Sequence, residues 1–395
     1  MHLHPGPLEV AFTIRGPITR ADLPGLCDRV CALLPGSGQV VVCDVAGVEP
    51  DAVTVDALAR LQLAAQRRGC GVSLCGASGQ LLDVVELMGL THVLPWHDER
   101  FAPRASCNPR RVQRTVLVNG VRLCSETFGD PDAPTILLIA GSTQSMDWWW
   151  DELCARLADG GRRVIRYDLR DTGQSVAYPP GRPGYDGADL VDDAIGLLDA
   201  LGVPRAHVVG MSMGGGIAQR LTLDHRARVA SLTLVSTSPA TSYAGQSQLP
   251  GVAPALARHL AAPPPGPDWS DRRAVVEYVL EDLGHYAGSV RSDEEQLRRL
   301  VETVVDRTVY VASSWSNHFA LAEPKSRGQL GDIDTPTLVL HGTEDPLFPL
   351  PHGQALAAAI PGARLVPLDG VGHEIPPSQT WDEVVPQLLG HTEGR

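Results

Sequence analysis

The chain has 395 residues, of which 43% are hydrophobic and 20% charged, a composition typical of folded globular protein and a length that suggests two domains. The formal net charge of −13 argues against a phosphate-binding surface, so we expect no nucleic-acid partner. The first eight residues lack the basic and apolar segments of an export signal, and no run of 18 apolar residues follows, which predicts a cytoplasmic protein without a membrane span.

The eight cysteines lie mostly inside apolar segments. In a chain without an export signal, reduced core thiols are expected rather than disulfides. Cys27 and Cys31 share one face of a predicted helix, but no second pair follows at the spacing of a closed zinc site. We therefore expect no metal and no cofactor.

Residues 1–100 alternate strand-like and helix-like segments, which predicts a small α/β domain. The predicted strands are 40–45 and 71–75, and the predicted helices are 23–34, 53–66 and 80–88.

The segment VVVCDVAGV at residues 40–48, followed by a helix, resembles the STAS domains of anti-sigma factor antagonists, and the resemblance covers residues 6–98. In that family an Asp-Ser-Ser-Gly loop opens the helix and holds a phosphorylated serine, whose charge a helix N-terminus stabilises. Here the corresponding residues are AVTV at 52–55, which leaves Thr54 as a candidate phosphoryl acceptor or, alternatively, a helix-capping threonine. The resemblance implies that this domain binds a protein partner or assists homodimerisation.

A polar stretch at 101–113, with two prolines and several arginines, predicts a linker to a second domain at 114–395, with the boundary near residue 110. The second domain opens with a predicted hairpin around Asn119-Gly120. Strands and helices then alternate, which predicts a mostly parallel sheet with helices on both faces. The predicted strands are 135–140, 163–167, 207–211, 231–235, 337–340 and 364–367, and the helical, proline-rich region at 239–330 predicts a lid.

Residues 210–214 have the sequence GMSMG, a Gly-x-Ser-x-Gly motif directly after an apolar strand and before a helix. This context is the one in which a sharp turn exposes a nucleophilic serine, here Ser212. A serine hydroxyl needs a base and a carboxylate that orients the base. Asp345 and His373 follow successive later strands and give the chain order Ser, Asp, His. Glu344 is the alternative carboxylate.

Acyl transfer also requires donors for the developing oxyanion, and two backbone amides are expected to supply them. One is that of Met213, and the other is that of Ser142 in the loop after the strand at 135–140. Trp148, Trp149 and Trp150 are predicted to begin the next helix, where one of them could line a substrate pocket and core packing is the alternative. His285 and His318 in the lid are expected at the surface.

Two segments, RVIRYDLRDTGQS at 163–175 and AHVVGMSMGG at 206–215, resemble α/β-hydrolases of the aclacinomycin methylesterase type, and the resemblance covers residues 114–392. It implies hydrolysis of a small-molecule carboxylic ester through an acyl-enzyme. Activity should fall at acid pH as His373 is protonated.

A serine at 212 disfavours epoxide hydrolases and haloalkane dehalogenases, which use an aspartate there, whereas esterase, lactonase, carbon-carbon hydrolase and perhydrolase remain open. The fusion to a STAS-like domain keeps a second hypothesis open, a small-molecule sensor whose hydrolase pocket signals through that domain to a regulatory partner.

Overall fold

A computed structural model describes residues 10–16, 40–48, 50–66, 71–75, 79–88, 90, 111–243, 249–322 and 328–393. The chain divides into two compact units, residues 1–109 and 110–395. The predicted helix at 23–34 lies outside the described residues. None of the described helices is both long and apolar enough to cross a membrane.

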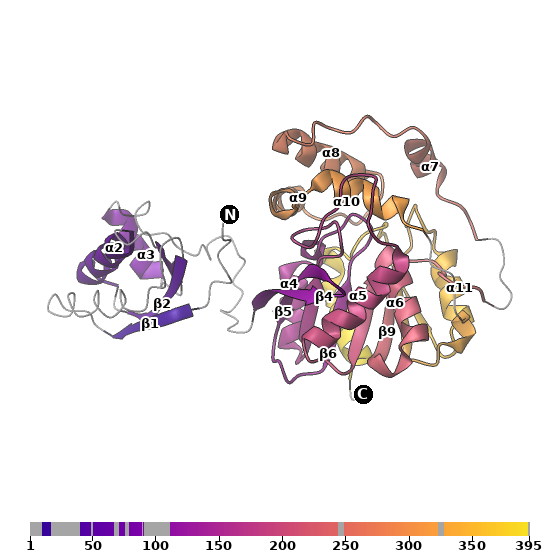
Figure 1. Cartoon of the computed structure of the whole chain (residues 1–395), viewed down its shortest axis with the longest axis horizontal. Coiled ribbons are helices and arrows are strands. Elements are labelled where there is room, and N and C mark those ends of the chain that lie inside the picture. Colours follow the sequence, from indigo (N-terminus) through magenta and orange to yellow (C-terminus); the bar gives the residue numbers. More distant parts are fainter. Residues whose placement is uncertain are drawn as a thin grey trace. The chain divides into compact units, whose positions relative to one another are not determined.

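The described residues of the N-terminal unit include a parallel sheet in the order β1-β2-β3, of which Figure 1 labels β1 and β2. The described strands are β1 Val10–Gly16, β2 Val40–Val48 and β3 Gly71–Cys75, and the described helices are α2 Ala52–Gln66 and α3 Gly79–Leu87. Apolar side chains of both helices are fully buried, among them Leu58, Leu61 and Leu81. Strand β1 is an addition to the strands that the sequence analysis predicts.

The second unit is built on an eight-stranded sheet in the order β11-β10-β9-β8-β6-β7-β5-β4. Strand β5 is antiparallel to both of its neighbours, and the other pairs are parallel. The strands are β4 Val112–Val118, β5 Val121–Phe128, β6 Thr135–Ile139, β7 Arg163–Tyr167, β8 Ala206–Met211, β9 Val229–Val235, β10 Thr337–Gly342 and β11 Arg364–Leu368.

Both faces of this sheet are covered by helices, and the central strand β6 shows how its residues divide between them. Ile136 and Leu138 belong to one buried cluster, together with side chains of α4 and α12. Leu137 and Ile139 belong to the other, together with side chains of α5, α6 and α11. Successive side chains of a strand point to opposite faces, so a strand buried on both faces is apolar throughout. The helices are α4 Asp151–Asp159, α5 Gly187–Ala200, α6 Met213–Asp224, α11 Pro351–Ala359 and α12 Trp381–His391.

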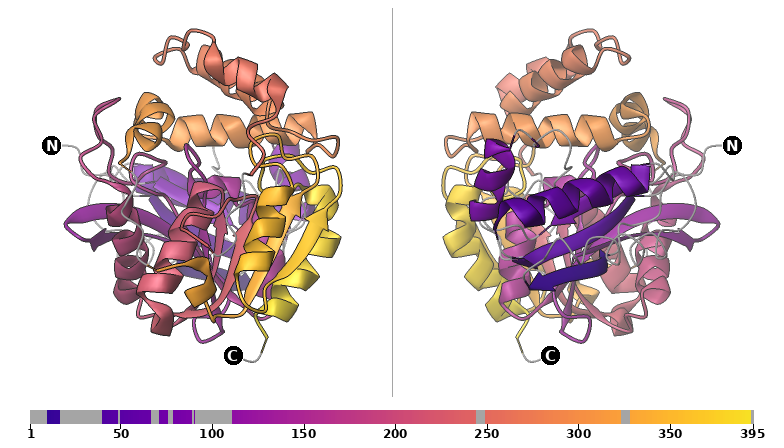
Figure 2. Two further views of the ribbon diagram at one scale, coloured as in Figure 1. Left: turned by 90° about the vertical axis from the view of Figure 1, so that its right-hand side faces the viewer. Right: turned by 90° about the vertical axis from the view of Figure 1, so that its left-hand side faces the viewer.

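Helices α7 to α10 are inserted between β9 and β10, within the region predicted as a lid, and residues 254–320 are called the cap below. They are α7 Pro254–Ala261, α8 Arg272–Gly284, α9 Glu294–Arg307 and α10 Val311–Asn317, followed by a short 3-10 turn at His318–Ala320. The helices of the cap gather beyond one end of the strands (Figures 1 and 2).

The helix predicted to begin at the three tryptophans begins later. Trp148 closes a 3-10 turn at 146–148, and Trp150 is the N-cap residue of α4. Between them, the carbonyl of Trp149 accepts a hydrogen bond from the guanidinium of Arg166. The sequence predicts that Trp149 lies in a helix, but its carbonyl is bonded to the side chain of Arg166 on β7, and α4 begins only at Asp151.

One contact between the cap and the rest of the second unit is a partly buried ion pair. Arg307, the last residue of α9, donates two hydrogen bonds of 2.8 and 2.6 Å to the carboxylate of Asp168, which is 0% exposed. It donates a third, 2.8 Å long, to Asp147. Asp168 also accepts the backbone amides of Met146 and Gln174, so its position is determined on several sides.

Replacing Arg307 by Met is expected to lower the free energy of unfolding by about 3 kcal/mol, because the carboxylate of Asp168 would remain buried without its cation. Urea denaturation, followed on the transition of the second unit, measures this difference. The matched control is Arg298→Met on the same helix, whose ion pair with Glu277 is exposed and is expected to contribute far less, because solvent screens it. Equal effects of the two substitutions would contradict the prediction.

Candidate active site

Ser212 occupies a sharp turn between β8 and α6. Its backbone angles are φ 52° and ψ −117°, in a region that side-chain-bearing residues rarely adopt. The amide of Ser212 donates to the carbonyl of Val235 on β9, a bond of 3.0 Å. A Cβ atom at Gly210 would lie 2.2 Å from the carbonyl oxygen of Gly214, and one at Gly214 would lie 2.4 Å from that of Ile139. The two glycines of the motif are thus required by close backbone contacts.

The structure brings the side chains of Ser212, His373 and Asp345 into one hydrogen-bonded row. Nε2 of His373 lies 2.9 Å from Oγ of Ser212, and Nδ1 lies 2.8 Å from Oδ2 of Asp345. His373 is 9% exposed and Asp345 is 3% exposed. Oδ1 of Asp345 accepts the amides of Leu347 and Phe348 at 2.9 and 2.8 Å, which fixes the carboxylate. This arrangement has the geometry in which a histidine can take a proton from a serine.

Two residues close to Asp345 in the chain, Glu344 and His341, have hydrogen-bond partners outside the row of Ser212, His373 and Asp345. Glu344 accepts hydrogen bonds from the amide and the hydroxyl of Ser289. His341 is 0% exposed, and its Nε2 lies 2.7 Å from the carbonyl oxygen of Phe348. Burial lowers the pKa of His341, so the ring is neutral at neutral pH and Nε2 is the donor. His341 thus holds the turn that carries Asp345.

The two predicted oxyanion donors lie beside each other. Met213 is the first residue of α6, where a helix leaves backbone amides without an intrahelical acceptor. The hydroxyl of Ser142 donates to Sδ of Met213, at 3.4 Å. Three neighbouring amides of this loop are bonded: that of Gly141 to the Gln144 side chain, that of Thr143 to His318 and that of Gln144 to Gly141. Among the described residues no acceptor is found for the amide of Ser142, so this amide is available to an oxyanion.

The tryptophans lie in the apolar core. Trp148 and Trp149 belong to the buried cluster that also contains valines of α8 and α9. Trp150 packs edge to face against Trp381 of α12, with ring centroids 6.4 Å apart. Contact of any of the three with a substrate remains a prediction.

Two aromatic rings that the sequence analysis does not single out flank His373. The ring centroid of Phe348 lies 5.4 Å and that of Tyr286 lies 6.2 Å from the imidazole. The carbonyl of Tyr286 also accepts the backbone amide of His373. Phe348 follows Asp345 by three residues and could have been found from that spacing, whereas Tyr286 comes from the cap and has no local signal.

His318, expected at the surface, is buried with an exposed fraction of 6%. Its Nδ1 accepts the amide of Thr143, and its Nε2 lies 2.8 Å from the carbonyl oxygen of Arg170. The expectation was wrong because the partners of His318 are distant in the chain and polar backbone atoms surround the ring.

Thr54 in the N-terminal unit is also buried, with an exposed fraction of 0%. It lies in the first turn of α2, and its amide donates to the side chain of Asp51. Asp51, not Thr54, therefore supplies the cap of this helix. A kinase could reach the Thr54 hydroxyl only after a local rearrangement. The burial of Thr54 does not support its phosphorylation, which remains a prediction.

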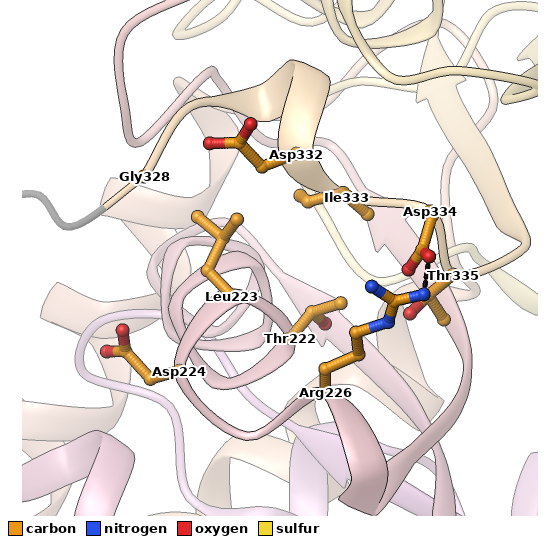
Figure 3. Close-up of a pocket in the computed structure, with 9 residues that line it drawn as sticks. All are labelled: Thr222, Leu223, Asp224, Arg226, Gly328, Asp332, Ile333, Asp334 and Thr335. Atoms are coloured by element: carbon orange, nitrogen blue, oxygen red, sulfur yellow. Dashed lines mark ion pairs between the residues drawn. The ribbon is translucent and has the colours of Figure 1, made fainter.

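A hollow of about 270 Å³ lies at the C-terminal end of α6, beside Thr222, Leu223 and Asp224 (Figure 3). Helix α6 has 12 residues and is therefore roughly 18 Å long, which separates this hollow from the triad. The charged side chains that line the hollow include Arg226, which forms an ion pair with Asp334. The lining residues are Thr222, Leu223, Asp224, Arg226, Gly328, Asp332, Ile333, Asp334 and Thr335.

Strand order, the turn at Ser212 and the inserted cap together define an α/β hydrolase. Residues 134–378 match the family model of the alpha/beta hydrolase fold, and the chain belongs to this family. Residues 7–95 match the family model described as Mlab, STAS domain, in agreement with the predicted resemblance.

Among curated proteins, the chain is 35% identical over 281 residues to rhodomycin D methylesterase of Streptomyces sp. (strain C5), covering 67% of this chain and 92% of the relative. It is 33% identical over 286 residues to the rhodomycin D methylesterase of Streptomyces peucetius, with the same coverages. Among solved structures, the enol-lactonase from Burkholderia xenovorans LB400 matches with a TM-score of 0.55 and 26% identity, covering 71% of this chain and 100% of that one.

The buried, neutral His341 is expected to make the protein less stable at acid pH. Its folded pKa lies below the ordinary value, so the unfolded state binds the proton more readily, and stability is lost as pH falls from about 6.5 through the folded pKa. Between about pH 7.5 and pH 5.5, the wild type should lose up to about 1 kcal/mol more unfolding free energy than His341→Gln. Urea denaturation at both pH values measures the difference, and parallel losses in the two proteins would contradict it.

Proposed function

We propose that the second unit is a serine hydrolase that cleaves a carboxylic ester through an acyl-enzyme, with Ser212 as nucleophile, His373 as general base and acid, and Asp345 as the carboxylate that orients His373. The observation that supports this most directly is the double contact of the His373 ring, with Ser212 on one side and Asp345 on the other. The relatives named methylesterases support an ester as the substrate class.

In the first half of the reaction, Oγ of Ser212 bonds to the carbonyl carbon while its proton passes to Nε2 of His373. The carbonyl oxygen becomes an oxyanion, for which the amides of Met213 and Ser142 are the proposed donors. The carbon–oxygen bond of the ester then breaks, and His373 gives its proton to the departing alkoxide. An alcohol leaves, and the acyl group stays on Ser212.

In the second half, water attacks the acyl carbon and gives a proton to His373. The bond to Oγ breaks, His373 returns the proton to Ser212, and the carboxylic acid is released. Asp345 stays ionised and stabilises the imidazolium at both stages. Two amide donors on its other carboxylate oxygen keep Oδ2 aimed at Nδ1 of His373.

A fluorophosphonate is expected to add once to the wild type and not at all to Ser212→Ala, because only a serine activated by a base reacts with it rapidly. Intact-mass analysis detects the adduct without knowledge of the substrate. A well-folded wild type that forms no adduct would overturn the proposal and favour a sensor that binds a ligand without turnover.

Two further variants separate the proposed carboxylate from its neighbour in the same test. An Asp-to-Asn change in a Ser-His-Asp triad lowers turnover by about 10⁴-fold, so Asp345→Asn should label far more slowly than the wild type. Glu344→Gln removes a carboxylate that bonds to Ser289 and should label at nearly the wild-type rate. The reverse order of the two would assign the role to Glu344.

For the N-terminal unit we propose binding of a protein partner or a second copy of the chain, which the match to the STAS family model supports. Size-exclusion chromatography with light scattering measures the molar mass of the full chain and of a chain that begins at residue 111. A full chain that dimerises while the shortened chain does not is the expected result for homodimerisation. A monomeric full chain that also captures no partner would overturn the proposal.

A further inference from the structure

The loop that supplies the proposed oxyanion donor Ser142 is held in place by the cap. Thr143, the next residue, has a left-handed backbone with φ 65°, a conformation that is unfavourable for a β-branched residue. Ser314 of α10 donates a hydrogen bond of 2.9 Å from its hydroxyl to the carbonyl of Thr143. The amide of Thr143 donates to Nδ1 of His318, 3.1 Å away. Both backbone groups of Thr143 are therefore bonded to side chains of the cap.

The second ring nitrogen fixes the state of His318. Its Nε2 lies 2.8 Å from the carbonyl oxygen of Arg170 and must carry the proton, which leaves Nδ1 as the acceptor for Thr143. Burial lowers the pKa of His318, so this neutral form prevails at neutral pH. Arg170 is itself fixed, because its guanidinium donates two hydrogen bonds of 2.7 and 2.8 Å to Asp193. The imidazole thus connects two rigid loops of the hydrolase core.

On the other side of Ser142, the loop bonds to itself. The amide of Gly141 donates to Oε1 of Gln144 at 2.9 Å, and the carbonyl of Gly141 accepts the amide of Gln144 at 3.3 Å. That carbonyl shares one planar trans peptide with the amide of Ser142, so the amide must point the opposite way. The direction of the Ser142 amide is therefore determined by Gly141 and Gln144 on one side and by Thr143 on the other.

We propose that Ser314 and His318 are positioning residues of the oxyanion hole, which hold Thr143 in its left-handed conformation so that the Ser142 amide faces the reacting carbonyl. This inference rests on the proposed role of Ser142. Neither side chain touches the substrate in this account. The cap thereby contributes to turnover.

The test compares four single substitutions in the full chain. Ser314→Ala removes the bond to the Thr143 carbonyl, and His318→Phe removes the acceptor for its amide at similar ring size. His318→Asn keeps an acceptor oxygen near the position of Nδ1 and should restore part of the activity. The matched control is Ser313→Ala, another buried serine on α10, whose hydroxyl donates to Tyr178 and not to Thr143.

Two readouts on these variants are the kcat and KM for p-nitrophenyl acetate and the rate of Ser212 labelling by a fluorophosphonate. Because loss of an oxyanion donor lowers kcat by about 10² to 10³-fold, a displaced donor should lower it less, by about tenfold in Ser314→Ala and about 10 to 100-fold in His318→Phe. KM should change little. His318→Asn should lie between His318→Phe and the wild type, and Ser313→Ala should match the wild type.

Amide hydrogen exchange of the peptide that contains residues 141–144 supplies a readout that does not depend on activity. This exchange should be faster in Ser314→Ala and in His318→Phe than in the wild type. In Ser313→Ala it should match the wild type. Wild-type rates of turnover and labelling in both variants would overturn the inference and leave the proposed function standing. An unreactive Ser212 in the wild type would overturn the proposed function and, with it, the catalytic part of this inference. If His318→Phe does not fold, Ser314→Ala decides.

Discussion

The geometry of the candidate active site depends on the turn at Ser212, where β8 passes directly into α6 with almost no space around the backbone. A non-glycine residue with a positive φ is strained, and it persists only where the surroundings determine it. Here the amide of Ser212 is bonded to β9, and the backbone of the following helix approaches Ile139 so closely that only glycine fits at 214. Because β6, β8 and β9 are neighbours in the sheet, the packing of three central strands sets the direction of one hydroxyl.

Loops at the ends of the strands supply the remaining groups of the site. Asp345 follows β10, and its carboxylate is turned toward His373 by two amides of its own loop and by the contact of His341 with Phe348. His373 follows β11 and receives a further backbone contact from Tyr286 in the cap. The sheet therefore places the three side chains, and short-range hydrogen bonds determine their orientation.

Local sequence signals predict those parts of the site and fold that depend on neighbouring residues. The alternation of strands and helices predicts the α/β fold, and the glycines around Ser212 predict the turn, because both depend on residues close in the chain. A period-2 alternation of Val10, Phe12 and Ile14 would also have indicated β1. By contrast, the late start of α4 depends on Arg166, and the burial of His318 depends on Thr143 and Arg170, which lie far from it in the sequence. Such contacts leave no periodic signal.

Under the proposed positioning role of Ser314 and His318, the sequence of the cap and the chemistry of the candidate site are coupled through the attachment of the cap to the core. Besides apolar packing, the cap is connected to the core by groups that need defined partners, among them the Arg307 ion pair with Asp168 and the bonds of Ser314 and His318 to Thr143. Apolar contacts tolerate changes of shape, whereas a buried donor or acceptor without a partner destabilises the fold. Apolar positions of the cap can therefore change more freely, whereas the polar positions that contact the core are constrained by the loop around Ser142. A cap taken from a relative would need a hydroxyl and a neutral ring nitrogen at the same two places to preserve that loop.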